Sequence, residues 1–360
     1  MISSNITKPL RIAQVSSLWV SVPPKTYGGI ERRVFHLAEE LVKRGHDVAL
    51  FATADSKTHA KLKSVYKYGL TEAMDKGEAY SYEYYINSSI QEVLQCSQSF
   101  DVIHFHLGCS AIPLSVLSKA PVLHTIPTAI TIDDIWVINR YPDVPIIALS
   151  EQQLEPLPLE LRKNIKVIYN GCDFDNYRLS ENPGKYLAFL GRMGPHKSPL
   201  NAIRIAKKLQ LPIVLAGAPL TNPEKIYFEK DILPLIDGNE VKYIGSVNDD
   251  QKNGLFSQAM ALLFPIQWEE PFGNVMIEAM ACGVPVIALN KGSVREVIDY
   301  GITGFYSDFL DDLLPLVSRA IKLNRRVIRE HAMSRFSHKK MVDEYIKVYE
   351  SIIENANSKC

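Results

Sequence analysis

The feature that most constrains this chain is a repeated alternation between short apolar runs and longer stretches with helical spacing. The runs are rich in Val, Ile and Leu, which is typical of parallel strands buried on both faces. Six of them lie in the first half: Arg11–Ser16, Asp47–Ala52, Val102–His106, Val122–Thr125, Ile146–Leu149 and Lys166–Tyr169. Five more lie in the second half: Tyr186–Leu190, Ile213–Ala216, Val241–Ile244, Ala261–Phe264 and Val286–Leu289. The stretches between runs are long enough for crossover helices, so we expect an α/β protein with parallel sheets.

A polar segment from Asn170 to Gly184 separates the two series and marks a domain boundary. At 360 residues the chain is long enough for two domains. We therefore expect one doubly wound domain over residues 1–172, a second over 173–335, and a final helix over 336–360. Ligands of such sheets bind beyond the carboxyl ends of the strands. Functional side chains are thus expected in loops that follow strands, on both sides of a cleft between the domains.

Composition excludes several classes of function. Forty basic residues balance forty acidic ones, so no overall field attracts nucleic acid or an anionic membrane. No apolar run has the length of a membrane span, and residues 1–9 do not resemble a secretory leader, which predicts a cytoplasmic protein. The five cysteines are scattered and lack C-x-x-C spacing, as expected of reduced thiols rather than disulfides or a zinc site.

In the first half, the candidate functional residues are two glycines and three histidines. Gly28 and Gly29 precede a helical pattern, where exposed amides could approach an anion, although a simple turn is the alternative. His104 and His106 share one face of a strand, and His106 ends it, where it could bind a substrate hydroxyl. The two could instead ligate a metal, but no third ligand is apparent. For all three histidines, His124 included, a structural role is the alternative.

In the second half, the loop after the Tyr186–Leu190 strand carries Arg192 and Lys197 among flexible glycines. A planar cation and a point cation in one loop suit a diphosphate, whose oxygens can be neutralised from two directions. The alternative is that both are solvated loop charges, which contribute little. Gly245 and Val247 follow another strand, and position alone assigns them to a nucleotide-base pocket.

The strongest feature is the segment from Leu263 to Ile287. A strand ends at its start, a Pro-Phe-Gly turn that includes Phe272 follows, and a helix begins near Asn274. Backbone amides from Gly273 to Val275 would then face a bound phosphate, because the first amides of a helix lack partners within it. The segment therefore predicts an anion site at the start of a helix.

Two glutamates flank that helix start. Glu270, in the loop, could accept hydrogen bonds from sugar hydroxyls, and Glu278, within the helix, could hold a ribose diol. As the alternative, Glu278 would only interact with the helix dipole, by about 0.3–1 kcal/mol, and Glu270 would be a surface charge. The spacing of the pair does not decide between these roles, since such pairs arise by chance in a chain of this length.

The segment Glu270-Pro-Phe-Gly-Asn-Val-Met-Ile-Glu278 resembles the E-x7-E signature of the retaining family 4 glycosyltransferases. Further matches occur in the family's order: Pro-x-x-Tyr-Gly-Gly-Ile-Glu-Arg near the start, Asp-Val-Ile-His-x-His, Tyr-Asn-Gly-x-Asp at the domain link, Gly-Arg…Lys, and Glu-Val-Ile…Gly-Ile-Thr-Gly-Phe. The resemblance covers nearly the whole chain. It implies the GT-B fold of two Rossmann-like domains, with the acceptor mainly in the first domain, the donor in the second, and a last helix that commonly returns to the first.

The resemblance also implies an activity and its residues. A sugar would move from a nucleoside diphosphate donor, most often UDP- or GDP-linked, to an acceptor hydroxyl with retention of configuration and with no metal or other cofactor. Arg192 and Lys197 are similar to the pair that binds the diphosphate. Glu270 resembles the contact to the donor sugar, Glu278 the contact to the ribose, and His106 the catalytic-cleft histidine.

Other assignments are less specific. By resemblance, Gly28 or Gly29 would meet the donor phosphates from the first domain. Phe272 and its neighbours are assigned to the donor on the other domain. His104 and His124 are assigned to the acceptor side as histidines of the first domain, not by resemblance. The acceptor itself would be a glycan, a lipid or a small molecule. Nucleic acid is not an expected partner, and membrane association is not indicated.

The sequence departs from the family pattern at three positions. Ser198 follows the lysine where many members have Gly, His196 replaces a frequent Glu, and Cys172 replaces an aliphatic residue at the domain link. None of these removes a group that the reaction needs. The alternatives are a non-catalytic nucleotide-sugar or glycan-binding protein, and an epimerase or phosphorylase of the same fold.

Overall fold

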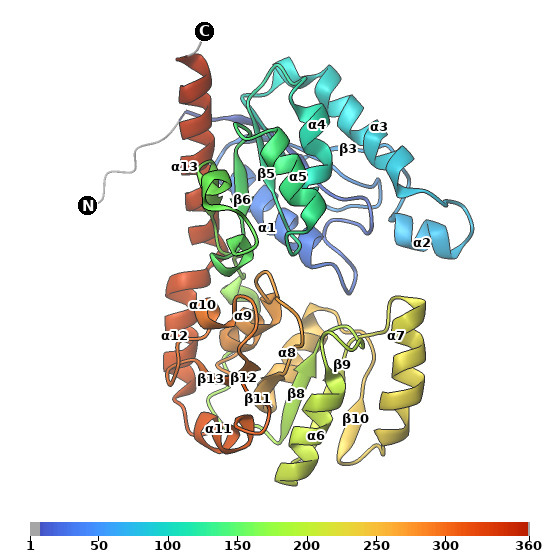
Figure 1. The fold of residues 1–360 in the computed structure, drawn as a ribbon, viewed down its shortest axis with the longest axis vertical. Coiled ribbons are helices and arrows are strands. Elements are labelled where there is room, and N and C mark those ends of the chain that lie inside the picture. Colours follow the sequence, from blue (N-terminus) through green and yellow to red (C-terminus); the bar gives the residue numbers. More distant parts are fainter. Residues whose placement is uncertain (1–7, 359–360) are drawn as a thin grey trace. The chain divides into compact units, whose positions relative to one another are not determined.

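The structure is a computed structural model that describes residues 8–358. Residues 1–7 and 359–360 lie outside the described residues. They include Cys360 and most of residues 1–9, the segment that we expect not to be a secretory leader. Contacts divide the chain into two compact units (Figure 1). Unit 1 consists of Met1–Leu149, Leu154–Ile168 and His338–Cys360, and unit 2 consists of Ser150–Gln153 and Tyr169–Ser337.

Unit 1 contains a seven-stranded parallel sheet in the order β3-β2-β1-β4-β5-β6-β7. Its strands are β1 Arg11–Val15, β2 Asp47–Phe51, β3 Lys61–Lys63, β4 Val102–Phe105, β5 Val122–Thr125, β6 Ile146–Ala148 and β7 Ile165–Val167. Its helices are α1 Gly29–Lys43, α2 Leu70–Asp75, α3 Tyr82–Gln95, α4 Ile112–Ser115, α5 Ile132–Arg140 and α13 His338–Asn357. The order of the strands reverses at β1 and β4, and in open parallel sheets this is where a ligand site is expected.

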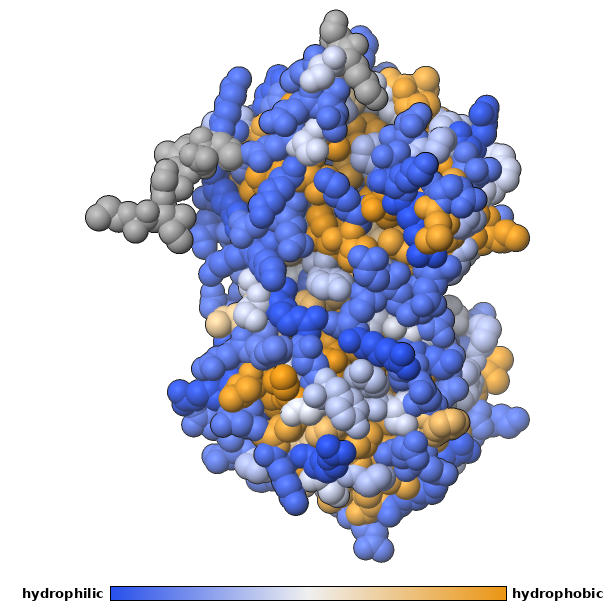
Figure 2. Space-filling view, turned by 60° about the vertical axis from the view of Figure 1, so that its left-hand side comes forward, coloured by the Kyte–Doolittle hydropathy of each residue, from blue (hydrophilic) through white to orange (hydrophobic). Residues whose placement is uncertain are grey.

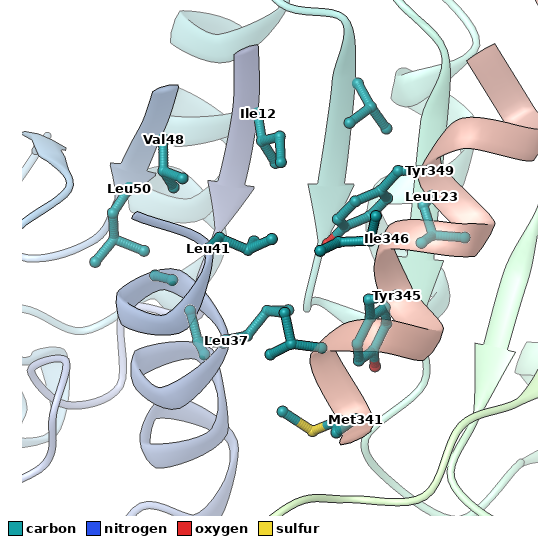
Figure 3. Close-up of a cluster of buried hydrophobic side chains, with 14 of the residues drawn as sticks. Ile12, Leu37, Leu41, Val48, Leu50, Leu123, Met341, Tyr345, Ile346 and Tyr349 are labelled. Atoms are coloured by element: carbon teal, nitrogen blue, oxygen red, sulfur yellow. The ribbon is translucent and has the colours of Figure 1, made fainter. Parts of the chain in front are cut away.

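The last helix, α13, belongs to the core of unit 1 although it is the end of the chain. Its buried residues Tyr345 and Tyr349 face the sheet and α1, where Leu37 and Leu41 lie (Figure 3). Spacings of four residues place such side chains on one side of a helix. Residues more than 200 positions apart in the sequence thus share one apolar cluster, which also includes Ile12 of β1.

Unit 2 contains a six-stranded parallel sheet in the order β10-β9-β8-β11-β12-β13. Its strands are β8 Tyr186–Leu190, β9 Ile213–Ala216, β10 Val241–Tyr243, β11 Ala259–Phe264, β12 Val286–Leu289 and β13 Gly304–Ser307. Its helices are α6 Pro199–Leu209, α7 Asn222–Tyr227, α8 Asp249–Ser257, α9 Asn274–Ala281, α10 Val294–Val297, α11 Leu313–Ala320 and α12 Arg325–Phe336. Strands β8 and β11 lie side by side where the order reverses, so the loops after both strands open at one edge of the sheet.

The predicted α/β class is confirmed, and each of the eleven predicted runs overlaps a parallel strand. The prediction missed β3 and β13. Strand β3 is short, lies at the edge of the sheet and has the sequence Lys-Leu-Lys, so it lacks an apolar run. Strand β13 begins with Gly304, which the sequence analysis considered only as part of a family motif. A Cβ on Gly304 would lie 2.1 Å from the Val286 carbonyl oxygen of β12, so the close approach of the two strands requires glycine.

Polar and charged side chains cover most of the face shown in Figure 2, and exposed apolar side chains gather in smaller areas. Among residues 8–358, no helix is both long enough and apolar enough to cross a membrane.

Candidate functional site

The turn before α9 is fixed by hydrogen bonds to three consecutive carbonyls. The amide of Ser293 donates to the Glu270 carbonyl (3.0 Å), and its hydroxyl donates to the Phe272 carbonyl (2.7 Å). The hydroxyl of Ser150 donates to the Pro271 carbonyl (2.7 Å). Both serines are fully buried. Because buried hydrogen bonds are costly to break, this pattern holds the chain in one path where it enters the helix.

Gly273 forms the N-cap of α9 with a φ of 76°, a conformation that favours glycine. A Cβ at this position would lie 2.7 Å from the Met276 side chain and 3.4 Å from Cγ of Glu270. Glu270 therefore lies against the start of the helix. Because Gly273 has no side chain, the N-cap residue cannot cap the first amides of α9. The helix start at Asn274 and Val275 carries a partial positive charge, which favours an anion there.

Lys197 and Glu270 form an ion pair, so the structure brings these two predicted residues together. The Trp268 indole donates to the same oxygen of Glu270 (2.9 Å), and the Lys197 ammonium lies 4.8 Å from the centre of the indole ring. The side chains of Lys197 and Glu270 are only 15% and 12% exposed. The alternatives that Lys197 is a solvated loop charge and Glu270 a surface charge do not fit this burial.

Arg192 forms an ion pair with Glu224 of α7 at 2.7 Å. His196 lies near the same carboxylate, with its Nδ1 4.0 Å from Oε1. Although burial alone would raise the pKa of Glu224, hydrogen bonds from the Leu220 amide and the Arg192 guanidinium hold that pKa below its ordinary value. Arg192 is thus placed by a buried, ionised carboxylate that the sequence analysis did not identify.

Glu278 is also paired with a residue that the sequence analysis missed. The Lys252 ammonium of α8 donates to Oε1 of Glu278 at 2.8 Å, and both residues are buried. Helix α8 follows the loop predicted to form the base pocket, in which Gly245 has a φ of 72° and Val247 is buried. A Cβ on Gly245 would meet nothing within 4 Å, so the backbone conformation rather than close packing favours glycine there.

In unit 1, Gly28 is the N-cap of α1 and Gly29 is its first residue. A Cβ on Gly28 would lie 2.6 Å from the Pro24 side chain, so the close approach of these segments requires glycine. Glu31, in the first turn of α1, is buried and accepts a hydrogen bond from the Ser17 hydroxyl. Burial raises the pKa of Glu31. An anion bound at this helix start would therefore lie close to the buried carboxyl group of Glu31.

Two of the predicted histidines join a buried network of neutral polar groups. His104 bonds through Nδ1 to the Tyr349 hydroxyl (2.8 Å) and through Nε2 to the Thr125 hydroxyl (2.7 Å). His106 bonds through Nε2 to Oε1 of Gln14 (2.7 Å), whose amide donates to Tyr349 (2.9 Å). Burial lowers the pKa of His104 well below its ordinary value and that of His106 to about 3. Both rings are therefore neutral near pH 7.

The burial of His104 and His124 favours the structural alternative over contact with an acceptor. Neither side chain is exposed at all, and both ring nitrogens of His104 bond to groups within unit 1. His124 bonds to the Ser115 hydroxyl (2.8 Å) and stacks on Phe105. The structural alternative fits both residues. In the described part of the chain, His104 and His106 gain no third ligand that would complete a metal site.

The residues that the sequence analysis missed are charge partners and positioning groups. Glu224 belongs to a Thr-x-x-Glu capping box, which is visible in the sequence but indicates only a helix start. Lys252 carries no local signal. Ser293 and Trp268 lie close to the predicted motif, but nothing in the spacing of the residues shows which atoms they contact.

Comparison with known families matches both halves of the chain. The model described as "Glycosyltransferase Family 4" matches residues 27–176, and the model "Glycosyl transferases group 1" matches residues 174–325. The two matches overlap at residues 174–176, and together they include the predicted site residues from Gly28 to Glu278.

Two relatives with known names extend over most of the chain. A D-inositol 3-phosphate glycosyltransferase of Mycolicibacterium smegmatis is 25% identical and covers 89% of this chain and 86% of its own length. A phosphatidyl-myo-inositol mannosyltransferase of Propionibacterium freudenreichii is 26% identical, and the match covers 77% of this chain and 78% of the relative's own length.

Solved structures share the fold. AviGT4, a glycosyltransferase involved in avilamycin A biosynthesis, superposes with a TM-score of 0.73 at 24% identity and covers 96% of this chain and 98% of its own. Anabaena HepE, solved in complex with UDP and glucose, gives a TM-score of 0.72 at 19% identity, and the match covers 95% of this chain and 100% of the HepE chain. With its two parallel-sheet units and these matches, the chain belongs to glycosyltransferase family 4 and has the GT-B fold.

Proposed function

We propose that this glycosyltransferase uses a nucleoside diphosphate sugar, UDP- or GDP-linked, and transfers the sugar to an acceptor hydroxyl with retention of configuration and without a metal ion. The acceptor is a glycan, a lipid or a small molecule. The proposal places the enzyme in the cytoplasm, where nucleotide sugars serve as soluble donors.

The observation that carries this proposal is the ion pair of Lys197 and Glu270 beside the start of α9. A cation, a carboxylate and a helix N-terminus are three groups that a sugar diphosphate can use together. The donor would take Lys197 as the partner of its phosphate oxygens, and Glu270 would then accept hydrogen bonds from the sugar hydroxyls. Each ionised group thus exchanges one partner for another instead of being left buried and unpaired.

The positive field for the leaving group would come from the protein itself. Arg192 and Lys197 contribute two cations, and the amides at Gly273 to Val275 contribute the helix dipole. Groups held in place before the reaction stabilise developing charge without reorganisation. This is why the proposal requires no divalent cation at the diphosphate.

The bond changes balance without a side-chain nucleophile. The bond between the anomeric carbon and the diphosphate oxygen breaks, and the acceptor oxygen bonds to the same face of that carbon. The acceptor proton passes to an oxygen of the departing phosphate. Retention follows because attack and departure share one face of the sugar.

The proposal gives the remaining predicted residues binding roles. Glu278 would bind the ribose through the carboxylate oxygen that does not bind Lys252. Gly28 and Gly29 would approach the phosphates, and His106 would hydrogen-bond the transferred sugar as a neutral ring. Its lowered pKa supports a role in hydrogen bonding rather than as a cation near pH 7.

The test begins with a thermal-shift panel of nucleotide sugars, because a donor that binds the folded protein raises its stability by mass action. The donor that binds is then incubated with candidate acceptors in the presence of EDTA. Release of the nucleoside diphosphate is measured, and the anomeric configuration of the product is read by NMR.

We expect turnover with EDTA present and an unchanged anomeric configuration. Inverted product or complete loss of turnover in EDTA would contradict the proposed mechanism. Binding of a donor with no release in the presence of any acceptor would favour the alternative of a non-catalytic binding protein.

A further inference from the structure

The Arg192 guanidinium is held at one end by a carboxylate from another element of unit 2. One terminal nitrogen, Nη2, lies 2.7 Å from Oε1 of Glu224. The Glu224 side chain is only 6% exposed, whereas the Arg192 side chain is 27% exposed. The glutamate is therefore the fixed member of the pair, and the arginine is the member that reaches solvent.

Glu224 is itself immobilised by the backbone around it. Its second oxygen, Oε2, accepts hydrogen bonds from the amides of Leu220 (2.8 Å) and Thr221 (3.1 Å). The Thr221 hydroxyl accepts from the Glu224 amide (3.4 Å), which completes a capping box at the start of α7. With Oε2 bound to the backbone, Oε1 remains as a rigid acceptor for Arg192.

The loop that carries Arg192 is shaped around this carboxylate. A Cβ on Gly194 would lie 2.8 Å from Oε1 of Glu224 and 2.8 Å from the His196 ring. A Cβ on Gly217, after β9, would lie 1.8 Å from the carbonyl oxygen of Gly191. Glycines are thus required where the loop approaches Glu224 and where it approaches the neighbouring strand.

One nitrogen of the Arg192 guanidinium lacks a partner within residues 8–358. The Nε atom of Arg192 is buried and has no hydrogen-bond partner among the residues that the structure describes. A buried donor without a partner costs about 1–3 kcal/mol. If Arg192 only stabilised the fold, a position that satisfies this donor would be favoured. Because the Arg192 side chain is 27% exposed, the geometry fits a guanidinium that Glu224 fixes at one end and that remains open to an anionic ligand at its exposed part.

We propose that Glu224 is a positioning residue that holds Arg192 in the orientation in which it receives the diphosphate of the donor. The inference rests on the proposed function, since it concerns the same site. The competing explanation is that Glu224 serves only as the cap of α7, with Arg192 as a passive neighbour.

The chain provides a matched control for that explanation. Glu224→Gln keeps the side-chain volume and the capacity to cap, but it removes the charge that orients Arg192. Thr221→Ala removes the other half of the capping box but keeps the carboxylate that pairs with Arg192. A residue that orients a functional group typically accounts for about 10–100-fold in activity. We expect Glu224→Gln to lower kcat within that range and Thr221→Ala to change it by less than about twofold, with folding of both checked by circular dichroism.

The second arm tests whether Glu224 acts through Arg192. In an Arg192→Ala background, adding Glu224→Gln should cause no further loss of kcat, because the group to be positioned is gone. An Arg192→Lys variant should lose most of its sensitivity to Glu224→Gln, since an ammonium lacks the planar fork. The affinity for the free nucleoside diphosphate, measured by calorimetry, should follow the same pattern.

The outcomes separate the inference from the function on which it rests. If the wild-type protein is active, two results would overturn the positioning role alone. One is a kcat of Glu224→Gln equal to that of the wild type, and the other is an equal loss of kcat in Glu224→Gln and Thr221→Ala. Independent, multiplicative losses from Glu224→Gln and Arg192→Ala would also overturn it. Wild-type protein that neither binds nor releases any nucleoside diphosphate would overturn the proposed function, and the inference with it.

Discussion

The polar groups at the strand ends of the two units differ in kind. Unit 1 buries a network of neutral groups in which His104 and His106 bond to hydroxyls and an amide. Unit 2 holds pairs of opposite charges: Arg192 with Glu224, Lys197 with Glu270 and Lys252 with Glu278. Both sheets are parallel and similarly wound, so the difference comes from the side chains and not from the fold.

The comparison shows two ways to keep polar groups in a protein interior. In unit 1, desolvation removes the charge of the histidines. In unit 2, each of the three cations named above has an anion in contact, which offsets the cost of burying a charge. Ion pairs can exchange partners with an anionic ligand, whereas neutral rings and hydroxyls are suited to ligand hydroxyls. This distinction agrees with a diphosphate site in unit 2.

The largest expected effect comes from breaking a charge pair in unit 2. Lys252→Met leaves Glu278 buried without its cation, which should lower the free energy of unfolding by about 3–5 kcal/mol. Restoring neutrality in Lys252→Met/Glu278→Gln should recover most of that loss. Lys208→Met, which removes an exposed pair with Asp311, should cost no more than about 1 kcal/mol. Urea denaturation measures all three, and equal losses for Lys252→Met and Lys208→Met would contradict the account.

Removal of Lys197 sharpens the comparison on the side of catalysis. Lys197→Ala should lower kcat by about 10²–10³-fold, the range found when one preorganised donor to a developing charge is removed. Lys207→Ala, an exposed lysine on α6, serves as the control and should leave kcat unchanged. Steady-state release of the nucleoside diphosphate provides the measurement. Full activity of Lys197→Ala would mean that the pair with Glu270 is structural only.

Unit 1 should respond to pH through its buried histidines. In the unfolded chain a histidine ionises near pH 6.5, whereas burial lowers the pKa of His106 and of His124 to about 3 in the folded protein. Above about pH 6.5 both histidines are neutral in the folded and in the unfolded state, so their burial costs no stability through protonation. As the pH falls from about 6.5 toward 3, the free energy of unfolding decreases, because the unfolded state takes up protons that the folded state does not. Each histidine contributes at most about 1.4 kcal/mol per pH unit.

This slope is measured by urea denaturation at several pH values between 4 and 7. His124→Gln, whose amide can replace Nε2 as the partner of Ser115, should reduce the slope by about one proton. An unchanged slope in this variant would show that His124 does not remain neutral in the folded protein.

The smallest expected effect concerns backbone strain beside Lys197. Ser198, at the N-cap of α6, and Gln210, at its C-cap, both have positive φ values, 59° and 54°. Ser198→Gly and Gln210→Gly should each raise stability by about 1 kcal/mol, because glycine adopts this conformation without a Cβ clash. Thermal unfolding compares the two. Stabilisation by Gln210→Gly only would indicate that the Ser198 side chain makes a contact that offsets its strain.

Sequence reasoning predicted the parts of the molecule that are local. Buried parallel strands are continuous apolar runs, so they were found, whereas the polar edge strand β3 was not. Residues in the Glu270 to Glu278 motif were identified because the motif and the helix start lie together in the chain. Their partners were not, since Glu224 and Lys252 are brought in from other helices.

The histidines show the same limit. Period-two alternation places His104 and His106 on one face of β4, but it cannot show what covers that face. In the folded protein Tyr349 of α13, 245 positions after His104, bonds to it. Burial by a segment so distant in the sequence has no local signal, so the sequence analysis could not choose between the acceptor role of His104 and its structural alternative.

The central claim is that Arg192 and Lys197 in unit 2 bind the donor diphosphate without a metal ion. The most direct measurement is calorimetric titration of UDP and of GDP, in EDTA, into the wild-type protein and into Arg192→Ala/Lys197→Ala. Two charge-assisted hydrogen bonds at about 1.5–3 kcal/mol each predict that the variant binds at least about 100-fold more weakly. Equal affinity of the wild-type protein and the variant for the nucleotide that binds would contradict the account.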